Sequence, residues 1–169
     1  METKKWTTRN QISCAGRSLG RLTIGSVLNQ ALDLLRVAIF GVPFVDLVAT
    51  MTDASIPLTS GEWQEWGNPN EKFFFQYMMD YSPMNNVRFG AQYPSCLVQA
   101  GLFDSRVPYW EPLKYTASLR YGVSNNNEGR PILLKTDMAA GHVSGSDRYK
   151  YIQSITFDSS FLFWQLGIN

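Results

Sequence analysis

The chain has 169 residues, of which 44% are hydrophobic and 17% are charged, and its formal net charge is +1. This length and composition predict one globular unit with a substantial core and exclude an intrinsically disordered chain. The balanced charge and the absence of a Lys/Arg tract exclude an electrostatic nucleic-acid binder. We expect a cytoplasmic protein without a signal peptide or membrane span. No apolar segment follows the N-terminal lysines, and charged residues interrupt the most apolar region, 22–51.

The apolar pattern predicts strands and helices in alternation, after a polar and frayed segment at 1–10. Strands are predicted at 11–15, 36–41, 96–101 and 131–136. Helices are predicted at 18–32, 43–52, 71–81, 109–121 and 147–165. Residues 53–70 are expected to form a long connection that its two tryptophans pack down. Crossovers of this length between strands are typical of βαβ units, so we expect an α/β fold with a mainly parallel four-stranded sheet and flanking helices.

Two details of this fold can be checked directly. The last helix is expected to bury five apolar side chains, those of Tyr151, Ile155, Phe161, Leu162 and Trp164. If the first three strands lie side by side in chain order, Cys14 and Cys96 are two strands apart, at about 9–10 Å. This separation is too large for a disulfide, so both cysteines are expected to be free thiols.

The sequence Gly16-Arg17-Ser18-Leu19-Gly20 lies between the first strand and the first helix. A Gly-x-Ser-x-Gly turn in this position has the form of the nucleophile elbow of α/β-hydrolases, in which a serine is held in strained backbone geometry. Most chance matches to this short pattern are ordinary turns. The strand before it and the helix after it favour the elbow.

Two further residues could complete a hydrolytic site with Ser18. Asp104 follows the third strand, and His142, the only histidine, follows the fourth. The chain order serine, aspartate, histidine is the order that α/β-hydrolases use, with each residue just past a strand's carboxyl end. An imidazole takes the serine proton and a carboxylate orients the imidazole. The alternative is that all three are ordinary polar loop residues.

Beyond this constellation, the chain from Gln11 onward resembles the catalytic domain of the prolyl oligopeptidase family of serine peptidases, and within it the oligopeptidase B branch. The motifs that carry the resemblance are Gly16-Arg17-Ser18, Gly41-Val42-Pro43-Phe44-Val45-Asp46, Ile56-Pro57-Leu58-Thr59-Ser60-Gly61-Glu62-Trp63, Glu65-Trp66-Gly67-Asn68-Pro69, Tyr81-Ser82-Pro83, Ala100-Gly101-Leu102, Tyr109-Trp110-Glu111-Pro112, Leu134-Lys135-Thr136-Asp137-Met138 and Ala140-Gly141-His142.

The resemblance implies a role for each site residue. Ser18 would be the nucleophile, His142 the general base and Asp104 the orienting carboxylate. The backbone N–H of Leu19 would stabilise the oxyanion. Arg106 would bind a substrate carbonyl, and the alternative for it is a solvated loop charge.

The resemblance also implies the substrate class: short peptides cleaved after Arg or Lys, with no cofactor and no metal. The specificity positions would be Glu62 and Gln64, and Gln64 replaces the second acidic residue of the family pattern. Glu65 is expected to face elsewhere, beside Trp66. Loss of one carboxylate weakens the prediction of strict basic specificity.

Several departures from the family pattern leave other functions open. Leu19 stands where a very small residue is usual, and Arg21 stands where a second glycine is usual. A buried Arg21 would be costly unless its charge reached water. The upstream propeller, the early strands of the hydrolase domain and an upstream oxyanion donor are not in this sequence. We therefore expect a C-terminal part of the hydrolase domain whose first strand is an exposed edge. The alternatives to a peptidase are a catalytically impaired fragment that associates through this edge, and a small-ester hydrolase.

Overall fold

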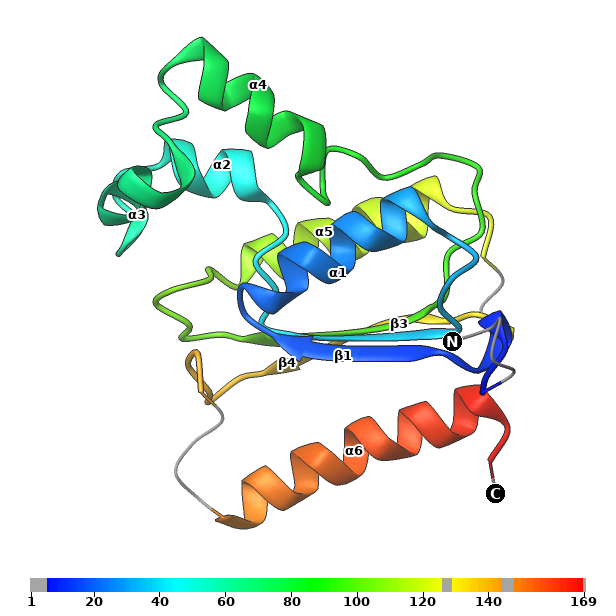
Figure 1. Cartoon of the computed structure of the whole chain (residues 1–169). Coiled ribbons are helices and arrows are strands. Elements are labelled where there is room, and N and C mark those ends of the chain that lie inside the picture. The colour runs from blue at the N-terminus through cyan, green and yellow to red at the C-terminus, as the bar shows by residue number, and fades with distance from the viewer. Residues whose placement is uncertain (1–5, 126–128, 144–147, 169) are drawn as a thin grey trace.

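A parallel four-stranded sheet forms the centre of the molecule (Figure 1). The computed structural model describes residues 6–125, 129–143 and 148–168. The strands β1 (Ser13–Arg17), β2 (Val37–Gly41), β3 (Ser95–Gly101) and β4 (Ile132–Asp137) lie side by side in chain order. All three pairings are parallel. The predicted α/β class and the predicted sheet are therefore confirmed.

Helices cover both faces of this sheet. The helices α1 (Gly20–Gln30) and α5 (Trp110–Gly122) pack on one face, and α6 (Arg148–Leu166) packs on the other (Figure 1). A further group, α2 (Leu47–Thr52), α3 (Thr59–Trp66) and α4 (Lys72–Tyr81), stands beyond the carboxyl ends of the strands. No helix in the described ranges is both long and apolar enough to cross a membrane.

The segment predicted as a long connection contains α3, so this part of the prediction is wrong. The helix has eight residues and begins after Leu58, whose backbone is left-handed with φ of 79°. Its tryptophans pack against the buried side chains of α2 and α4, and the Trp63 indole N–H donates a 3.0 Å hydrogen bond to the Met51 carbonyl. The apolar positions in 53–70 are too few for a helical period to be visible, although the packing role of the tryptophans is as expected.

The register of the sheet confirms the prediction for the cysteines. Cys14 pairs with Ala38, and Ala38 pairs in turn with Cys96. The two cysteines are therefore separated by a whole strand, and both are free. Burial raises the pKa of the Cys96 thiol to about 12, which keeps it protonated and unreactive near neutral pH.

The two central strands form the core. Every residue of β2 is buried, and six of the seven residues of β3 are buried, as expected for strands covered on both faces. Phe40 of β2 and Tyr115 of α5 pack edge to face, with ring centroids 5.8 Å apart. On the other face, Ile39 and Leu97 pack against Phe161 of α6.

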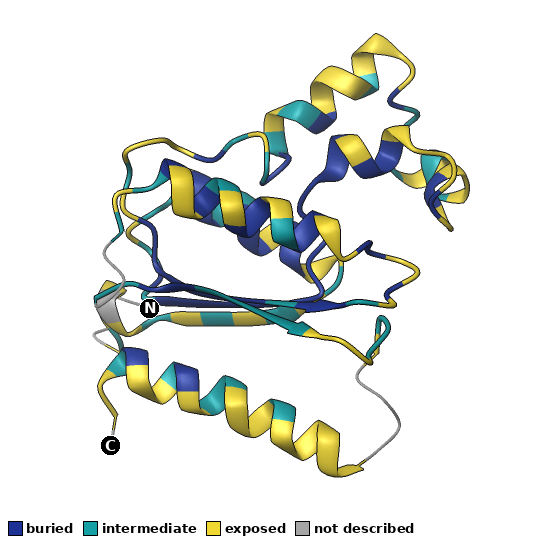
Figure 2. Cartoon of the chain, turned by 180° about the vertical axis from the view of Figure 1, so that it is seen from behind, coloured by how far each residue is buried: buried dark blue, intermediate teal, exposed yellow. Residues whose placement is uncertain are grey.

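The edge strand β1 and the outer side of α6 are much more exposed (Figure 2). Alternate residues of β1 are exposed, and the exposed fractions of Tyr151, Ile155 and Trp164 are 58%, 47% and 58%. The prediction that these three side chains are buried is wrong, whereas Phe161 is buried and Leu162 is half-buried. A single helix on a sheet buries only one stripe of its surface, and the apolar residues of α6 occur around more of its circumference than one stripe.

The N-terminal segment that was predicted to be frayed is only partly described. Residues 1–5 lie outside the described ranges. A short 3-10 helix spans Arg9–Gln11, and Arg9 forms an ion pair with Asp33, which lies after α1.

Glu111, in the first turn of α5, connects the sheet to the α2 segment. Its Oε1 accepts hydrogen bonds from the N–H groups of Val45 and Asp46 at 2.5 and 2.8 Å, and its Oε2 accepts one from the Thr50 hydroxyl at 2.8 Å. The side chain is 1% exposed, and burial raises its pKa from 4.5 to about 7. The carboxyl therefore fixes the start of α2, and its protonation is linked to folding.

Glu111→Gln is expected to remove a pH dependence of stability. The pKa of Glu111 is higher in the folded state than in the unfolded state. The contribution of its protonated carboxyl to folding stability is therefore complete below pH 4.5 and is lost as the pH rises to about 7. The loss is on the order of 3 kcal/mol of unfolding free energy. Urea unfolding between pH 4.5 and 8 should show this slope in the wild type and a smaller one in the variant. Glu71→Gln, at an exposed carboxylate, is the matched control, and equal slopes for wild type and Glu111→Gln would contradict the assignment.

Candidate active site

Ser18 lies in a sharp turn between β1 and α1. Its φ is 53°, a left-handed value that is uncommon for a residue other than glycine. Its N–H donates a 3.0 Å hydrogen bond to the Gly41 carbonyl at the end of β2, and its carbonyl accepts one from the Arg21 N–H at 2.9 Å. A Cβ on Gly16 would lie 3.2 Å from a methyl group of Ile24, so a larger residue would be crowded between strand and helix. The segment therefore forms the tight strand-to-helix turn expected from the sequence, with Ser18 in left-handed backbone geometry.

The loops after β3 and β4 are held together by their backbones. The N–H of Phe103 donates to the Ala140 carbonyl at 3.0 Å, and the N–H of Leu102 donates to the Asp137 carbonyl at 2.9 Å. A Cβ on Gly101 would lie only 2.5 Å from the Gly141 carbonyl oxygen. Only glycine permits this close approach, which brings the loop that carries Asp104 against the loop that carries His142.

The three predicted residues form one continuous hydrogen-bonded chain. The Nε2 of His142 lies 3.0 Å from the Ser18 Oγ, and its Nδ1 lies 3.0 and 2.9 Å from the two carboxylate oxygens of Asp104. An ionised carboxylate can only accept a hydrogen bond, so Nδ1 carries the proton in the neutral ring. Nε2 is then the acceptor for the serine hydroxyl proton.

The carboxylate of Asp104 is itself fixed by the backbone. Its Oδ1 accepts hydrogen bonds from the N–H groups of Arg106 and Val107, both at 2.9 Å. The Asp104 side chain is 1% exposed and that of His142 is 13% exposed. The arrangement holds the imidazole in one orientation and leaves its Nε2 side beside the serine.

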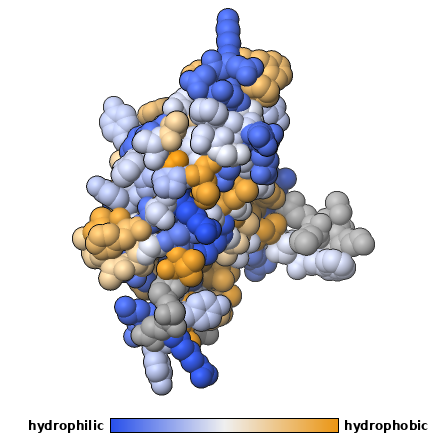
Figure 3. Space-filling view, turned by 90° about the vertical axis from the view of Figure 1, so that its left-hand side faces the viewer, coloured by the Kyte–Doolittle hydropathy of each residue, from blue (hydrophilic) through white to orange (hydrophobic). Residues whose placement is uncertain are grey.

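A cleft of about 130 Å³ opens beside Ser18, at the carboxyl ends of the strands. Figure 3 views this side of the molecule, where a hydrophilic strip crosses between hydrophobic patches. Glu62 is the one carboxylate among the described residues that line the cleft, and burial together with the nearby Glu65 raises the pKa of Glu62. The lining consists of Ser18, Leu19, Phe44, Thr50, Met51, Pro57, Leu58, Thr59, Glu62, Arg106 and Val107.

Comparison with known proteins identifies the family of this chain. The family model described as the prolyl oligopeptidase family matches residues 1–169. The chain belongs to the prolyl oligopeptidase family. It is 41% identical to dipeptidyl aminopeptidase BI of Pseudoxanthomonas mexicana, over 96% of this chain and 22% of that protein. It is 39% identical to protease 2 of Moraxella lacunata, over 98% of this chain and 23% of that protein.

Solved structures of oligopeptidase B share the fold. The enzyme from Leishmania major superimposes with a TM-score of 0.93 at 49% identity, covering 98% of this chain and 22% of that one. The enzyme from Trypanosoma brucei gives a TM-score of 0.93 at 50% identity, covering 99% and 23%. The fold is thus that of the α/β-hydrolase catalytic domain of the prolyl oligopeptidase family. The chain spans between a fifth and a quarter of the length of these relatives.

Not every residue suggested by the prolyl oligopeptidase resemblance reaches the cleft. Glu62 and Arg106 line it with Ser18, but Gln64 does not. Gln64 is exposed and lines a separate cleft with Glu65 and Trp66 between α3 and α4. Residues two apart on a helix point to different sides, so only one of Glu62 and Gln64 can face Ser18.

The two departures from the prolyl oligopeptidase pattern have different consequences. Leu19 is 44% exposed and lies at the mouth of the cleft, so its side chain is accommodated outside the turn. Arg21 is only 3% exposed, and burial lowers the pKa of its guanidinium to about 9. The expectation of a costly buried charge at this position is therefore confirmed.

Two contributions to the site gave no signal in the sequence. The Arg17 Nη2 donates a 2.8 Å hydrogen bond to the His142 carbonyl, across 125 residues of chain. Val42, directly after β2, has a φ of 44° although it is β-branched, which is a strained backbone next to the serine turn. The long-range contact could not be read from local pattern, and a valine does not suggest a left-handed residue.

Proposed function

We propose that this chain supplies the Ser18–His142–Asp104 triad of a cytoplasmic serine oligopeptidase that cleaves short peptides after Arg or Lys. The observation that carries the proposal is the hydrogen-bonded chain from hydroxyl to imidazole to carboxylate, with distances of 2.9–3.0 Å. These distances lie within the range for general-base catalysis.

The proposed chemistry is acyl transfer in two steps. The Ser18 Oγ attacks the scissile carbonyl carbon while His142 Nε2 takes the hydroxyl proton, and Asp104 stabilises the resulting imidazolium. The imidazolium then gives this proton to the leaving amine, which leaves an acyl-serine ester. Water attacks the ester, with His142 again as the base, and this second step releases the new carboxylate and restores the serine.

Backbone and side-chain donors near Ser18 support the tetrahedral intermediate. Leu19 lies immediately before the first residue of α1, where N–H groups have no partner within the helix. Its N–H is the proposed oxyanion donor. Arg106, in the same cleft, is proposed to bind a second carbonyl of the peptide through its planar guanidinium.

Glu62 is the proposed determinant of basic specificity. Its carboxylate lines the cleft beside Ser18, and burial together with the nearby Glu65 raises its pKa, so a cationic partner would stabilise its charged form. A guanidinium or ammonium group of the substrate would supply that partner. With one acidic residue in the cleft, a preference for basic residues is expected rather than an absolute requirement.

Glu62→Gln is expected to lower kcat/KM for an arginyl substrate by about 10- to 100-fold, the value of one charge-assisted hydrogen bond. Turnover of a simple acetate ester should change little, because that substrate has no cation. Glu65→Gln is the matched control, since Glu65 neighbours Glu62 but does not line the cleft. An equal loss on both substrates would contradict the specificity role. Efficient turnover of the acetate ester with no preference for the arginyl substrate would instead favour a small-ester hydrolase.

A second candidate function is an interaction role without efficient catalysis. The exposed edge of β1 and the exposed aromatic side chains of α6 favour it, because an open edge can pair with a strand of a partner. The two candidates give opposite results for the purified chain. A folded monomer that hydrolyses an arginyl ester would exclude the interaction role as the main function.

A further inference from the structure

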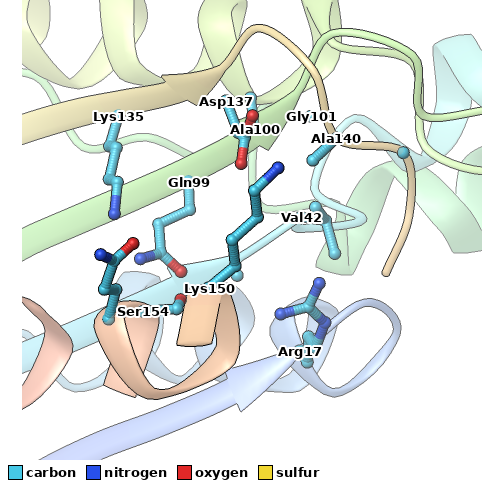
Figure 4. A pocket seen from close by; sticks show the side chains of 13 residues that line it. Arg17, Val42, Gln99, Ala100, Gly101, Lys135, Asp137, Ala140, Lys150 and Ser154 are labelled. Carbon is cyan, nitrogen blue, oxygen red and sulfur yellow. The ribbon is translucent and has the colours of Figure 1, made fainter. Parts of the chain in front are cut away.

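A second cavity, of about 300 Å³, lies between the carboxyl halves of the strands and α6 (Figure 4). It shares no lining residue with the cleft beside Ser18. Its lining consists of Arg17, Gly41, Val42, Gln99, Ala100, Gly101, Lys135, Asp137, Ala140, Gly141, Lys150, Gln153 and Ser154. The proposed peptidase chemistry uses none of the charged groups in this cavity.

The charges around this cavity are mainly positive. Arg17, Lys135 and Lys150 line it from β1, β4 and α6, whereas Asp137 is the one carboxylate among its described lining residues (Figure 4). The ammonium group of Lys135 lies 4.0 Å from the centre of the Phe157 ring, which limits its movement. Positive groups from three separate elements thus surround one space.

Arg21 adds a fourth positive charge behind the cavity wall. It is 3% exposed, and among the described residues no acceptor lies within hydrogen-bond distance of its Nε or Nη1. Its Nη2 lies 3.6 Å from the position of a Cβ on Gly41, and the same empty position is 3.5 Å from the Gln99 Oε1. Gly41 lines the cavity and Arg21 does not, so the Arg21 guanidinium lies directly behind the part of the wall that Gly41 forms.

The burial of Arg21 is not fully compensated by the protein. Burial lowers its pKa to about 9, against an opposing effect of Asp158 on α6. The Asp158 carboxylate also accepts a 2.6 Å hydrogen bond from the Gln99 Nε2 and interacts with Arg17 and Lys135, so it is shared among several groups. With Asp137 and Asp158 counted against four cations, two positive charges remain.

We propose that this cavity binds a small oxyanion of the phosphate class. A tetrahedral dianion has acceptor oxygens in several directions, which suits one guanidinium and two ammonium groups that come from different sides. It would neutralise the two remaining charges and supply a negative partner for Arg21. A single carboxylate carries one negative charge and would neutralise only one of the two remaining positive charges.

The site is connected to the loop of His142. Ala140 and Gly141 line the cavity, and Arg17, which lines it too, donates its hydrogen bond to the His142 carbonyl. An anion bound by Arg17 would hold this guanidinium in place and thereby the carbonyl that it contacts. The binding itself does not depend on catalysis, so it can be measured in Ser18→Ala.

The test is a titration of the chain with inorganic phosphate, in which calorimetry measures binding and the thermal unfolding midpoint measures stability. The reference titration uses sodium chloride at equal ionic strength. We expect saturable binding and a rise of the midpoint with phosphate only. Lys150→Gln and Arg21→Met should each weaken binding at least tenfold. Arg21→Met should also raise the midpoint without phosphate, because it removes a buried charge with unpaired donors. Lys72→Gln, an exposed lysine on α4, is the matched control and should bind as the wild type does.

Equal effects of chloride and phosphate, or equal loss of binding in Lys72→Gln and Lys150→Gln, would overturn the proposal. If Arg21→Met fails to fold, Lys150→Gln still decides, because Lys150 is exposed on the helix surface. Competition by glycerol phosphate would show that a phosphate ester also fits, and its absence would restrict the site to the free ion. Phosphate binding by Ser18→Ala at wild-type affinity separates this site from the proposed peptidase function.

Discussion

Replacing Ser18 with alanine is expected to lower turnover of an arginyl ester by a factor on the order of 10⁶ and to abolish labelling by a fluorophosphonate probe. The alanine has no oxygen to attack the substrate or the probe. His142 keeps its bond to Asp104 but has no proton to accept. Stability should change little, because the strained φ is held by the backbone bonds of residues 16–22 and by the bond from the Ser18 N–H to Gly41.

The matched control for this prediction is Ser60→Ala, on the exposed surface of α3. This variant should be labelled and should turn over substrate as the wild type does. If the probe labelled wild type and Ser18→Ala equally, Ser18 would not be the nucleophile. If the probe labelled neither, the chain would lack peptidase chemistry in this form, and the interaction role would be favoured.

The positions of Ser18, Asp104 and His142 at one edge of the sheet could be predicted because they depend on local rules. Each follows a strand of a parallel sheet, and the carboxyl ends of parallel strands lie at one edge. The order of the strands is needed as well, and the sequence leaves it as a condition that the structure meets with the order β1-β2-β3-β4. Membership of one sheet is not sufficient, because β1 and β4 are separated by two strands, and the loop after β4 reaches across the edge to bring His142 to Ser18.

The parts of the site that were not predicted depend on contacts across the fold. The resemblance places Gln64 beside Glu62 as a specificity position, but the helical geometry of α3 turns it to another cleft. The hydrogen bond from Arg17 to His142 and the carboxyl of Glu111 under α2 join residues far apart in the chain. A single sequence contains no period or spacing that reports such pairs.

The hydrogen-bonded chain of Ser18, His142 and Asp104 forms although the sequence spans only a small part of its relatives' length, because its contacts lie within one sheet and its loops. Every member of the hydrogen-bonded chain, and the backbone contacts that position it, come from one four-stranded sheet and its own loops. The apolar residues of α6 occur around more than one stripe of the helix, and the sequence does not tell which stripe packs on the sheet. The contacts that form the site lie within one sheet and its loops, whereas the burial of a surface helix face depends on what else packs against it.

Asp104→Asn is expected to lower kcat by about 10⁴ while leaving the fold intact. The Oδ1 position accepts two backbone N–H groups, so the amide oxygen of asparagine will occupy it. The amide NH₂ then takes the Oδ2 position, 2.9 Å from the His142 Nδ1, and donates to that nitrogen. The ring must move its proton to Nε2, which can no longer accept the proton of Ser18. Asp53→Asn is the matched control, since Asp53 also accepts a backbone N–H two residues ahead but lies outside the cleft. A variant that unfolds at the wild-type temperature yet loses activity supports this tautomer mechanism, whereas retention of full kcat would show that the carboxylate does not orient the histidine.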